Sequence, residues 1–304
     1  MRFVFYAWFV IALFVGAVHA QTPNPLMSST QLAKDLRFPA QTSTFSAFST
    51  PEMAMYKPEG PGPFPALVLQ HQCGGLKGER GWINASMLEW ARKAVAQGYV
   101  VLLIDSLSAR GVSSVCMGAK GGVNFARGVR DTLQAAEHLR QQTYVDPDRI
   151  AMVGFSWGGM NAILGSSTAW GEALAVDARF KAAVAFYPGC YPIRPANGNP
   201  YEIVRRDIDR PLLVLMGSKD TETPPEDCIS RLEPAKTAGA PVEWHVYENT
   251  THCWDCKNLH NYSKVDLRGT QVVYHFDEGI TQDSERRMFD FLSRTMPPKP
   301  KATR

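Results

Sequence analysis

Three features are missing from this 304-residue sequence, and each absence excludes a class of protein. Lysine and arginine exceed aspartate and glutamate by only 32 to 29, and no basic stripe is interleaved with aromatics, so nucleic acid is not an expected partner. No internal repeat is visible, which argues against a propeller or other repeat array. Beyond the first twenty residues no apolar run is long enough to span a membrane, so we expect no stable span in the rest of the chain.

The first twenty residues have the composition of an export signal. "MRFVFYAWFVIALFVGAVHA" contains Arg2, an apolar run and small residues before a cut after Ala20. The alternative is a membrane anchor, although the run is short for one. We therefore expect a secreted or periplasmic protein. Residues 21–45 are expected to be a loose leader, 46–296 one α/β domain without an obvious long lid, and 297–304 a disordered tail.

Short apolar runs alternate with amphipathic segments through the rest of the chain. This alternation predicts an α/β fold with a mostly parallel sheet and helices on both faces. Right-handed crossovers then bring the carboxyl ends of the strands to one edge, where active sites of such folds collect. The strands are expected at 64–71, 99–106, 149–155, 181–188, 210–217 and 242–249, and the helices at 85–98, 124–142, 157–167, 225–239 and 284–295.

Ser156 lies in "GFSWGG", between a predicted strand and a predicted helix. A lone G-x-S-x-G is weak evidence, but a strand-to-helix turn is the context that a nucleophile elbow requires. A serine hydroxyl needs a base and an orienting acid. Asp220 follows the 210–217 strand and is the candidate acid, unless it only caps the next helix. His252 follows the last strand and is the candidate base.

Other histidines compete with His252 for the role of base. His138 falls on a predicted helix and His245 within a strand, which favours structural roles for both. The remaining rivals are His71, His260 and His275. The chain order Ser156, Asp220, His252 is nevertheless the order found in α/β-hydrolases.

An oxyanion hole needs two backbone N–H donors. One is expected from Trp157, the residue after the nucleophile. The other is expected from Cys73 in "QHQCGG", a glycine-containing loop after an early strand. The alternative for this loop is an ordinary glycine turn.

With these residues in place, the chain resembles the dienelactone hydrolase family of α/β-hydrolases over about residues 50–295. The resemblance implies that Ser156 replaces the cysteine nucleophile of the founding enzyme, as in the family's serine esterases. It also implies one carboxylate-binding arginine at Arg110, whereas the second arginine falls at Cys256 and a glutamate at Gln72. We therefore expect hydrolysis of an ester or lactone rather than of dienelactone itself. The matching stretches are "LVLQHQCGG", "VVLLIDSLSARG", "DPDRIAMVGFSWGG", "AAVAFYPGC", "LLVLMGSKDTETPPEDC" and "HVYENTTHCWD".

Six cysteines lie beyond the export signal. An even number in an exported chain favours disulfides over scattered buried thiols. Because neighbouring strands end side by side, the least contorted pairing joins Cys73 to Cys116, Cys190 to Cys228 and Cys253 to Cys256. A zinc site at "HCWDC" (252–256) is an alternative for the last pair.

Taken together, the sequence predicts an exported serine hydrolase that cleaves a small-molecule carboxylic ester or lactone through an acyl-enzyme, without a metal or organic cofactor. One alternative is a serine peptidase of the prolyl-oligopeptidase type. Another is a non-catalytic binding protein with the same fold.

Overall fold

The computed structural model describes residues 33–298 apart from 79–80, 175–178, 196–198 and 267. The expected export signal, residues 21–32 of the leader and residues 299–304 of the tail therefore lie outside the described residues. A seven-stranded sheet has the order β1-β3-β2-β4-β5-β6-β7, and all of its pairs are parallel except β1 with β3. Its strands are β1 (Ala54–Tyr56), β2 (Phe64–Gln70), β3 (Val100–Ile104), β4 (Val145–Phe155), β5 (Ala182–Phe186), β6 (Leu212–Gly217) and β7 (Val242–Tyr247).

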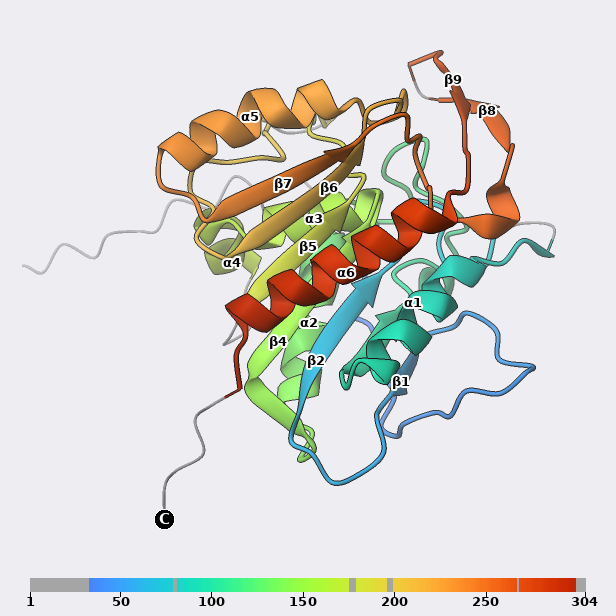
Figure 1. The fold of residues 1–304 in the computed structure, drawn as a ribbon, viewed down its shortest axis with the longest axis vertical. Helices are drawn as coiled ribbons and strands as arrows, with labels where there is room; N and C mark the ends of the chain where they lie inside the picture. Colours follow the sequence, from blue (N-terminus) through green and yellow to red (C-terminus); the bar gives the residue numbers. More distant parts are fainter. Residues whose placement is uncertain (1–32, 79–80, 175–178, 196–198, 267, 299–304) are drawn as a thin grey trace, which may run out of the picture.

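Helices cover both faces of this sheet, with α1 and α6 in front and α2, α3 and α4 behind in the view of Figure 1. The helices are α1 (Ala85–Ala96), α2 (Phe125–Arg140), α3 (Trp157–Gly165), α4 (Thr168–Leu174), α5 (Pro225–Thr237) and α6 (Glu278–Thr295). This is the α/β-hydrolase architecture that the alternation predicts. None of the helices in the described ranges combines the length and apolarity needed to cross a membrane.

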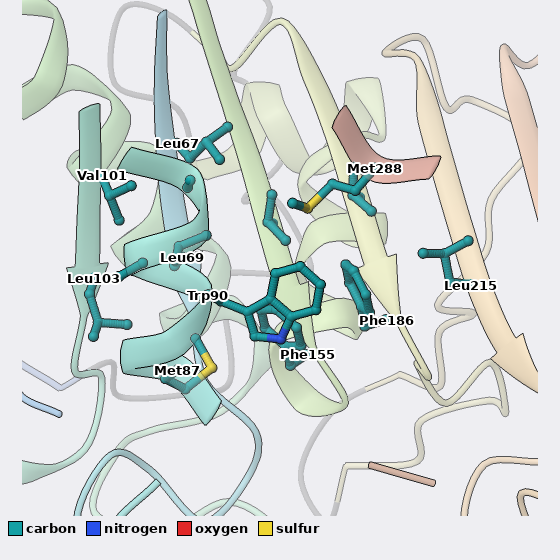
Figure 2. Close-up of a cluster of buried hydrophobic side chains, with 14 of the residues drawn as sticks. Leu67, Leu69, Met87, Trp90, Val101, Leu103, Phe155, Phe186, Leu215 and Met288 are labelled. Atoms are coloured by element: carbon teal, nitrogen blue, oxygen red, sulfur yellow. The ribbon is translucent and has the colours of Figure 1, made fainter. Parts of the chain in front are cut away.

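Alternate residues of each strand enter different cores, because successive side chains of a strand point to opposite faces. Val101 and Leu103 of β3 pack in the cluster that includes α1 and α6, whereas Val100 and Leu102 pack with α2. In the first cluster the Trp90 ring of α1 packs on both Phe155 and Phe186, at centroid distances of 5.6 and 5.0 Å, and these two rings stack on each other at 4.7 Å (Figure 2). Burial of each such side chain stabilises the fold by about 1.5–3 kcal/mol, so the strand ends are firmly held.

The structure contains elements that the sequence pattern does not reveal. Strands β8 (Ser263–Val265) and β9 (Gln271–Val273) form a separate antiparallel hairpin, which stands beyond the strand ends near the start of α6 (Figure 1). Strands of three residues are too short to display a period of two. The hairpin segment also reaches the candidate site, where its residues line the cavity.

Residues 33–45 were expected to be loose, but they make specific contacts. Asp35 forms an ion pair with the buried Arg127 of α2 at 2.7 Å. The Phe45 ring stacks on Tyr56 with centroids 4.1 Å apart. The polar composition of this segment gives no local sign of these contacts, because the partner residues lie in α2 and β1.

Candidate active site

Ser156 occupies a sharp turn between β4 and α3. Its backbone has φ 52° and ψ −111°, a combination that side chains other than glycine seldom adopt. The turn needs the glycines around it: a Cβ at Gly154 would lie 2.0 Å from the Gly158 carbonyl oxygen, and one at Gly158 would lie 2.4 Å from the Gln70 carbonyl oxygen. Thus the G-x-S-x-G spacing reflects close backbone packing, and the strain is of the kind that accumulates at functional sites.

Three side chains from separate strand ends meet at this turn. The Ser156 hydroxyl lies 3.1 Å from His252 Nε2, and His252 Nδ1 lies 2.7 Å from Asp220 Oδ2. All three residues are buried. The serine, base and acid expected from the sequence are therefore brought together within hydrogen-bond distance, in the arrangement of a nucleophile, its base and an orienting carboxylate.

The Asp220 carboxylate is held by its own loop. Its Oδ1 accepts hydrogen bonds from the backbone N–H groups of Glu222 and Thr223 at 3.0 and 2.8 Å. The Thr223 hydroxyl donates to Oδ2 at 2.7 Å. Helix α5 begins after Pro224 and has no side-chain cap, so Asp220 holds its own loop and faces the imidazole rather than capping the next helix.

Glu222 is a second carboxylate at the site, which the sequence analysis missed. Its Oε2 lies 3.9 Å from His252 Nε2, on the side of the ring that faces Ser156. Tyr274 donates to the same oxygen at 2.6 Å, and Lys264 Nζ lies 2.8 Å from Oε1. Only the position of Glu222, two residues after Asp220, could have drawn attention to it.

Two opposing effects act on the pKa of His252. Burial alone would lower this pKa, but the charges of Asp220 and Glu222 raise it above the ordinary value. Glu222 in turn is kept ionised: burial acts to raise its pKa, whereas His252 and Lys264 lower it below its usual range. The site therefore stabilises a positive imidazolium, the form that a general base takes after accepting a proton.

A cavity of about 610 Å³ opens above Ser156. That volume lies within the range of small-molecule sites. Its walls come from the loop after β2, the loop after β3, the His252 loop and the hairpin segment. The lining residues are Gln72, Cys73, Gly74, Gly78, Trp82, Asn84, Ser113, Ser114, Cys116, Ser156, Glu222, His252, Cys253, Cys256, Leu259, Tyr262, Lys264 and Tyr274.

The segment between His252 and α6 forms one wall of this cavity. Leu259, Tyr262, Lys264 and Tyr274 all come from it. Its attachment is specific, because Arg268 donates hydrogen bonds to the carbonyl oxygens of the Asp220 loop at 2.8 and 2.6 Å. The hairpin is therefore part of the site rather than a detached excursion.

Beneath the cavity lies a buried polar network that the sequence did not suggest. Trp90 Nε1 and the Tyr187 hydroxyl donate to opposite oxygens of Asp255 at 2.8 and 2.7 Å. Burial raises the pKa of the Asp255 carboxyl, and the two hydrogen bonds oppose this rise. Gln72 Nε2 donates to the Tyr187 hydroxyl at 3.1 Å, and Asn84 donates to Gln72 Oε1. Gln72, expected to bind substrate, thus lines the cavity with an amide already bonded within the protein.

Three disulfides join the same cysteines that the sheet order pairs: Cys73–Cys116, Cys190–Cys228 and Cys253–Cys256. The first and third line the cavity. The second lies in the apolar core beside α5. The expectation that all three bridges surround the site is therefore wrong for this one.

The proposed zinc alternative at 252–256 does not fit these bonds. Cys253, Asp255 and Cys256 cluster with ligand atoms within 4.8 Å of one another. However, the two sulfurs are bonded to each other in a disulfide, whereas a cysteine binds a metal ion only as a free thiolate.

Arg110 does not occupy a substrate-binding position. Its guanidinium donates to both oxygens of Asp131 at 2.6 and 2.8 Å and to the Ser106 carbonyl at 2.8 Å. It is not among the described residues that line the cavity. The expectation of a carboxylate-binding arginine is therefore corrected: the side chain neutralises a buried aspartate of α2, a partner that cannot be foreseen from the loop sequence.

The rival histidines all lie in other surroundings. His71 is buried and accepts a hydrogen bond from the Ser106 N–H, and burial lowers its pKa. His138 contacts the Pro39 carbonyl, and His260 accepts from the Phe276 N–H. The His245 ring packs on Tyr247. Of the six histidines in the described part of the chain, only His252 is hydrogen-bonded to Ser156.

The two expected oxyanion donors come from the turn of the nucleophile and from a wall of its cavity. Trp157 is the first residue of α3, where a backbone N–H has no partner within the helix. Cys73 lines the same cavity as Ser156, in a loop tied to Cys116. Both amides are therefore suitably situated candidates.

Comparison with known proteins agrees with this architecture. The model of the dienelactone hydrolase family matches residues 52–296, most of the chain. The chain belongs to the dienelactone hydrolase family. Membership of this family makes the protein a carboxylic ester hydrolase of the ester and lactone type.

Curated relatives are similar to the chain in sequence, and solved structures share its fold. A presumed carboxymethylenebutenolidase from Yersinia pestis is 25% identical over 240 residues, which cover 77% of this chain and 79% of the relative. The structure of a presumed dienelactone hydrolase from Klebsiella pneumoniae aligns with a TM-score of 0.59 at 18% identity, over 80% of this chain and 93% of that one. Esterase 2 of Thermogutta terrifontis, solved after phosphorylation by paraoxon, aligns with a TM-score of 0.58 at 19% identity, over 81% and 90% of the two chains.

Proposed function

We propose that the protein is an exported serine esterase that uses Ser156 as nucleophile, His252 as base and Asp220 as orienting acid. The observation that carries this proposal is the continuous hydrogen-bonded path from the Ser156 hydroxyl through His252 to Asp220 at 3.1 and 2.7 Å. Its position on a strained turn at the bottom of a cavity of about 610 Å³ adds support.

The reaction follows from the order of these contacts, in which the imidazole lies between the serine hydroxyl and the carboxylate. His252 Nε2 takes the hydroxyl proton as Ser156 Oγ attacks the ester carbonyl, while Asp220 holds the Nδ1–H tautomer. The backbone N–H groups of Trp157 and Cys73 receive the developing oxyanion. The imidazolium then protonates the leaving alcohol, and a water, deprotonated by His252, cleaves the acyl-enzyme.

A serine-directed organophosphate tests the assignment directly. Paraoxon should inactivate the wild type and add one diethylphosphoryl group to Ser156, as identified by peptide mass mapping. Ser156→Ala protein should take up no label. Labelling of a different residue in the wild type would overturn the proposed nucleophile.

Export is supported by independent features. The first twenty residues have the composition of a signal, and six cysteines are joined as three disulfides, which persist in oxidising compartments. Expression with the full sequence should yield a protein outside the cytoplasm that begins at Gln21. An intact amino terminus on cytoplasmic protein would contradict export.

A further inference from the structure

His71 is a buried histidine that the proposed reaction does not use. It lies directly after β2, in the loop that leads to Cys73, and its exposed fraction is 0%. A buried imidazole needs a hydrogen-bond partner for each of its two nitrogens. The two partners of His71 show what this side chain holds in place.

The two ring nitrogens of His71 have opposite roles. Nε2 lies 3.1 Å from the backbone nitrogen of Ser106, and a backbone N–H can only donate. Nε2 therefore accepts this hydrogen bond, and the ring proton lies on Nδ1. Nδ1 in turn lies 2.6 Å from the Gln72 carbonyl oxygen and donates to it. These two hydrogen bonds fix the tautomer and the orientation of the ring.

The nearby Asp105 does not convert His71 into the cation of an ion pair. The Oδ1 atom of Asp105 lies 3.9 Å from Nε2 and accepts the backbone N–H groups of Leu107 and Ser108, each at 2.9 Å. Burial lowers the pKa of His71 by more than the charge of Asp105 raises it. The imidazole therefore stays neutral, with its single proton on Nδ1.

The Gln72 carbonyl belongs to the same peptide unit as the Cys73 N–H. This peptide is trans and planar, so its C=O and N–H point in opposite directions. The carbonyl faces two donors, His71 Nδ1 and the Gly75 N–H, which lies at 3.1 Å. The Cys73 N–H is therefore directed away from His71, and hydrogen bonds to the carbonyl strengthen it as a donor. Cys73 itself lines the cavity together with Ser156.

His71 also contacts the segment that carries the second expected oxyanion donor. Its ring stacks on the Trp157 indole, with centroids 5.9 Å apart and planes inclined by 16°. A Cβ at Gly158 would lie 2.7 Å from the His71 carbonyl oxygen, so the loop after β2 and the first turn of α3 are in close contact. One residue thus contacts both segments from which oxyanion donors are expected.

We propose that His71 is a positioning residue for the oxyanion hole: its Nδ1–H holds the carbonyl of the Gln72–Cys73 peptide and thereby aims the Cys73 N–H into the cavity. The inference rests on the proposed esterase function and adds a residue to it. Because the oxyanion exists only after the nucleophile has attacked, His71 acts on the transition state and not on the binding of the ester.

Two variants separate the two hydrogen bonds of the ring. In His71→Gln the side-chain carbonyl replaces Nε2 as acceptor for Ser106, but the donor to Gln72 is lost. In His71→Asn the side-chain amide replaces Nδ1 and keeps that donor. His71→Gln should lower kcat and kcat/KM for p-nitrophenyl acetate equally, by about 10- to 100-fold, less than the about 10²- to 10³-fold loss on deleting an oxyanion donor. His71→Asn should recover most of this loss. Circular dichroism melting sets an assay temperature at which both variants are folded.

A trifluoromethyl ketone inhibitor measures the oxyanion hole directly. Ser156 Oγ bonds to its carbonyl carbon, the hydroxyl proton passes to His252, and the C=O electrons become an oxyanion. The affinity of this inhibitor should fall in His71→Gln by the same factor as kcat/KM and recover in His71→Asn. Wild-type kcat in folded His71→Gln, or an equal loss in both variants, would overturn the inference.

Nitrogen-15 NMR of the imidazole tests the wild type without any substitution. At the pH of the assay Nδ1 of His71 should carry the proton and Nε2 should carry none, and the opposite tautomer would overturn the inference. Failure of the esterase function has a different signature. The wild type would then be inactive on p-nitrophenyl acetate, or Ser156→Ala would keep its activity.

Discussion

The floor and the mouth of the cavity are built in different ways. On the floor, Ser156, Asp220 and His252 are buried at the ends of parallel strands, where backbone geometry and loop hydrogen bonds hold them. At the mouth, the hairpin segment contributes exposed apolar and charged side chains from short strands outside the main sheet. The difference suggests that the strand ends set the chemistry, whereas the segment between His252 and α6 shapes the space through which esters reach it.

The largest effect is expected from removing the nucleophile on the floor. Ser156→Ala should lower kcat by about 10⁵- to 10⁶-fold, because the triad residues act as a unit. Steady-state hydrolysis of p-nitrophenyl acetate measures the loss. If the variant kept more than about a tenth of the wild-type activity, the nucleophile would lie elsewhere.

His252→Ala should be nearly as damaging, since the base and nucleophile act together. His260→Ala and His275→Ala are matched controls from the wall segment and should retain most activity. The same ester assay ranks the three variants. If His275→Ala were inactive and His252→Ala active, the general base would be His275 of the wall segment.

Comparing two of the disulfides distinguishes an effect on the active site from an effect on the stability of the core. Cys73→Ser with Cys116→Ser opens a loop of separation 43, and Cys190→Ser with Cys228→Ser opens one of 38. Chain entropy predicts a similar loss of about 4 kcal/mol in unfolding free energy for each. Only the first pair lines the cavity, so it should lose more activity at temperatures where both variants stay folded. Mild reduction of the wild type should likewise weaken activity before unfolding.

Equal loss of activity in the two double variants, measured with folded protein, would show that these bridges act only through stability. Peptide mapping without reductant checks the pairing itself. Six free thiols in the exported protein would contradict it.

Arg110→Ala should affect stability rather than selectivity. The change removes two hydrogen bonds to the buried Asp131, which Arg127 still contacts at 2.9 Å, so we expect a loss of about 2–3 kcal/mol in unfolding free energy. Urea unfolding measures this loss. KM for acidic and neutral esters should change alike; a rise for acidic esters alone would restore Arg110 to substrate binding.

The smallest effect is expected from Glu222, where wall and floor meet. His252 must be neutral to act as base, so activity appears as the pH rises through its raised pKa. Glu222→Gln removes a negative charge that raises the pKa of His252. It also leaves the positive charge of Lys264 without its carboxylate partner, and both changes lower the pKa of His252. The acid limb of the kcat/KM profile should therefore shift to lower pH. Glu226→Gln, on the exposed first turn of α5, is the control and should not shift it.

Local patterns account for much of the agreement between sequence and structure. Buried strands read as continuous apolar runs, and each predicted main strand and helix is present, although α6 begins at Glu278 rather than at residue 284. The expected order of strand ends along one edge of the sheet was enough to pair Cys73 with Cys116 from the sequence alone. Short β1, β8 and β9 escaped notice because three residues carry no detectable period.

The sequence by itself determined the α/β order, the glycine-flanked turn at Ser156 and the strand ends that carry Asp220 and His252, because these depend on local backbone geometry and hydrophobic periodicity. Only the tertiary structure decided that Arg110 neutralises Asp131, that Glu222 faces His252 and that the β8–β9 segment lines the cavity. These are contacts between segments far apart in the chain. A charged or apolar side chain carries the same local signal whether it binds substrate, pairs with a buried neighbour or faces water.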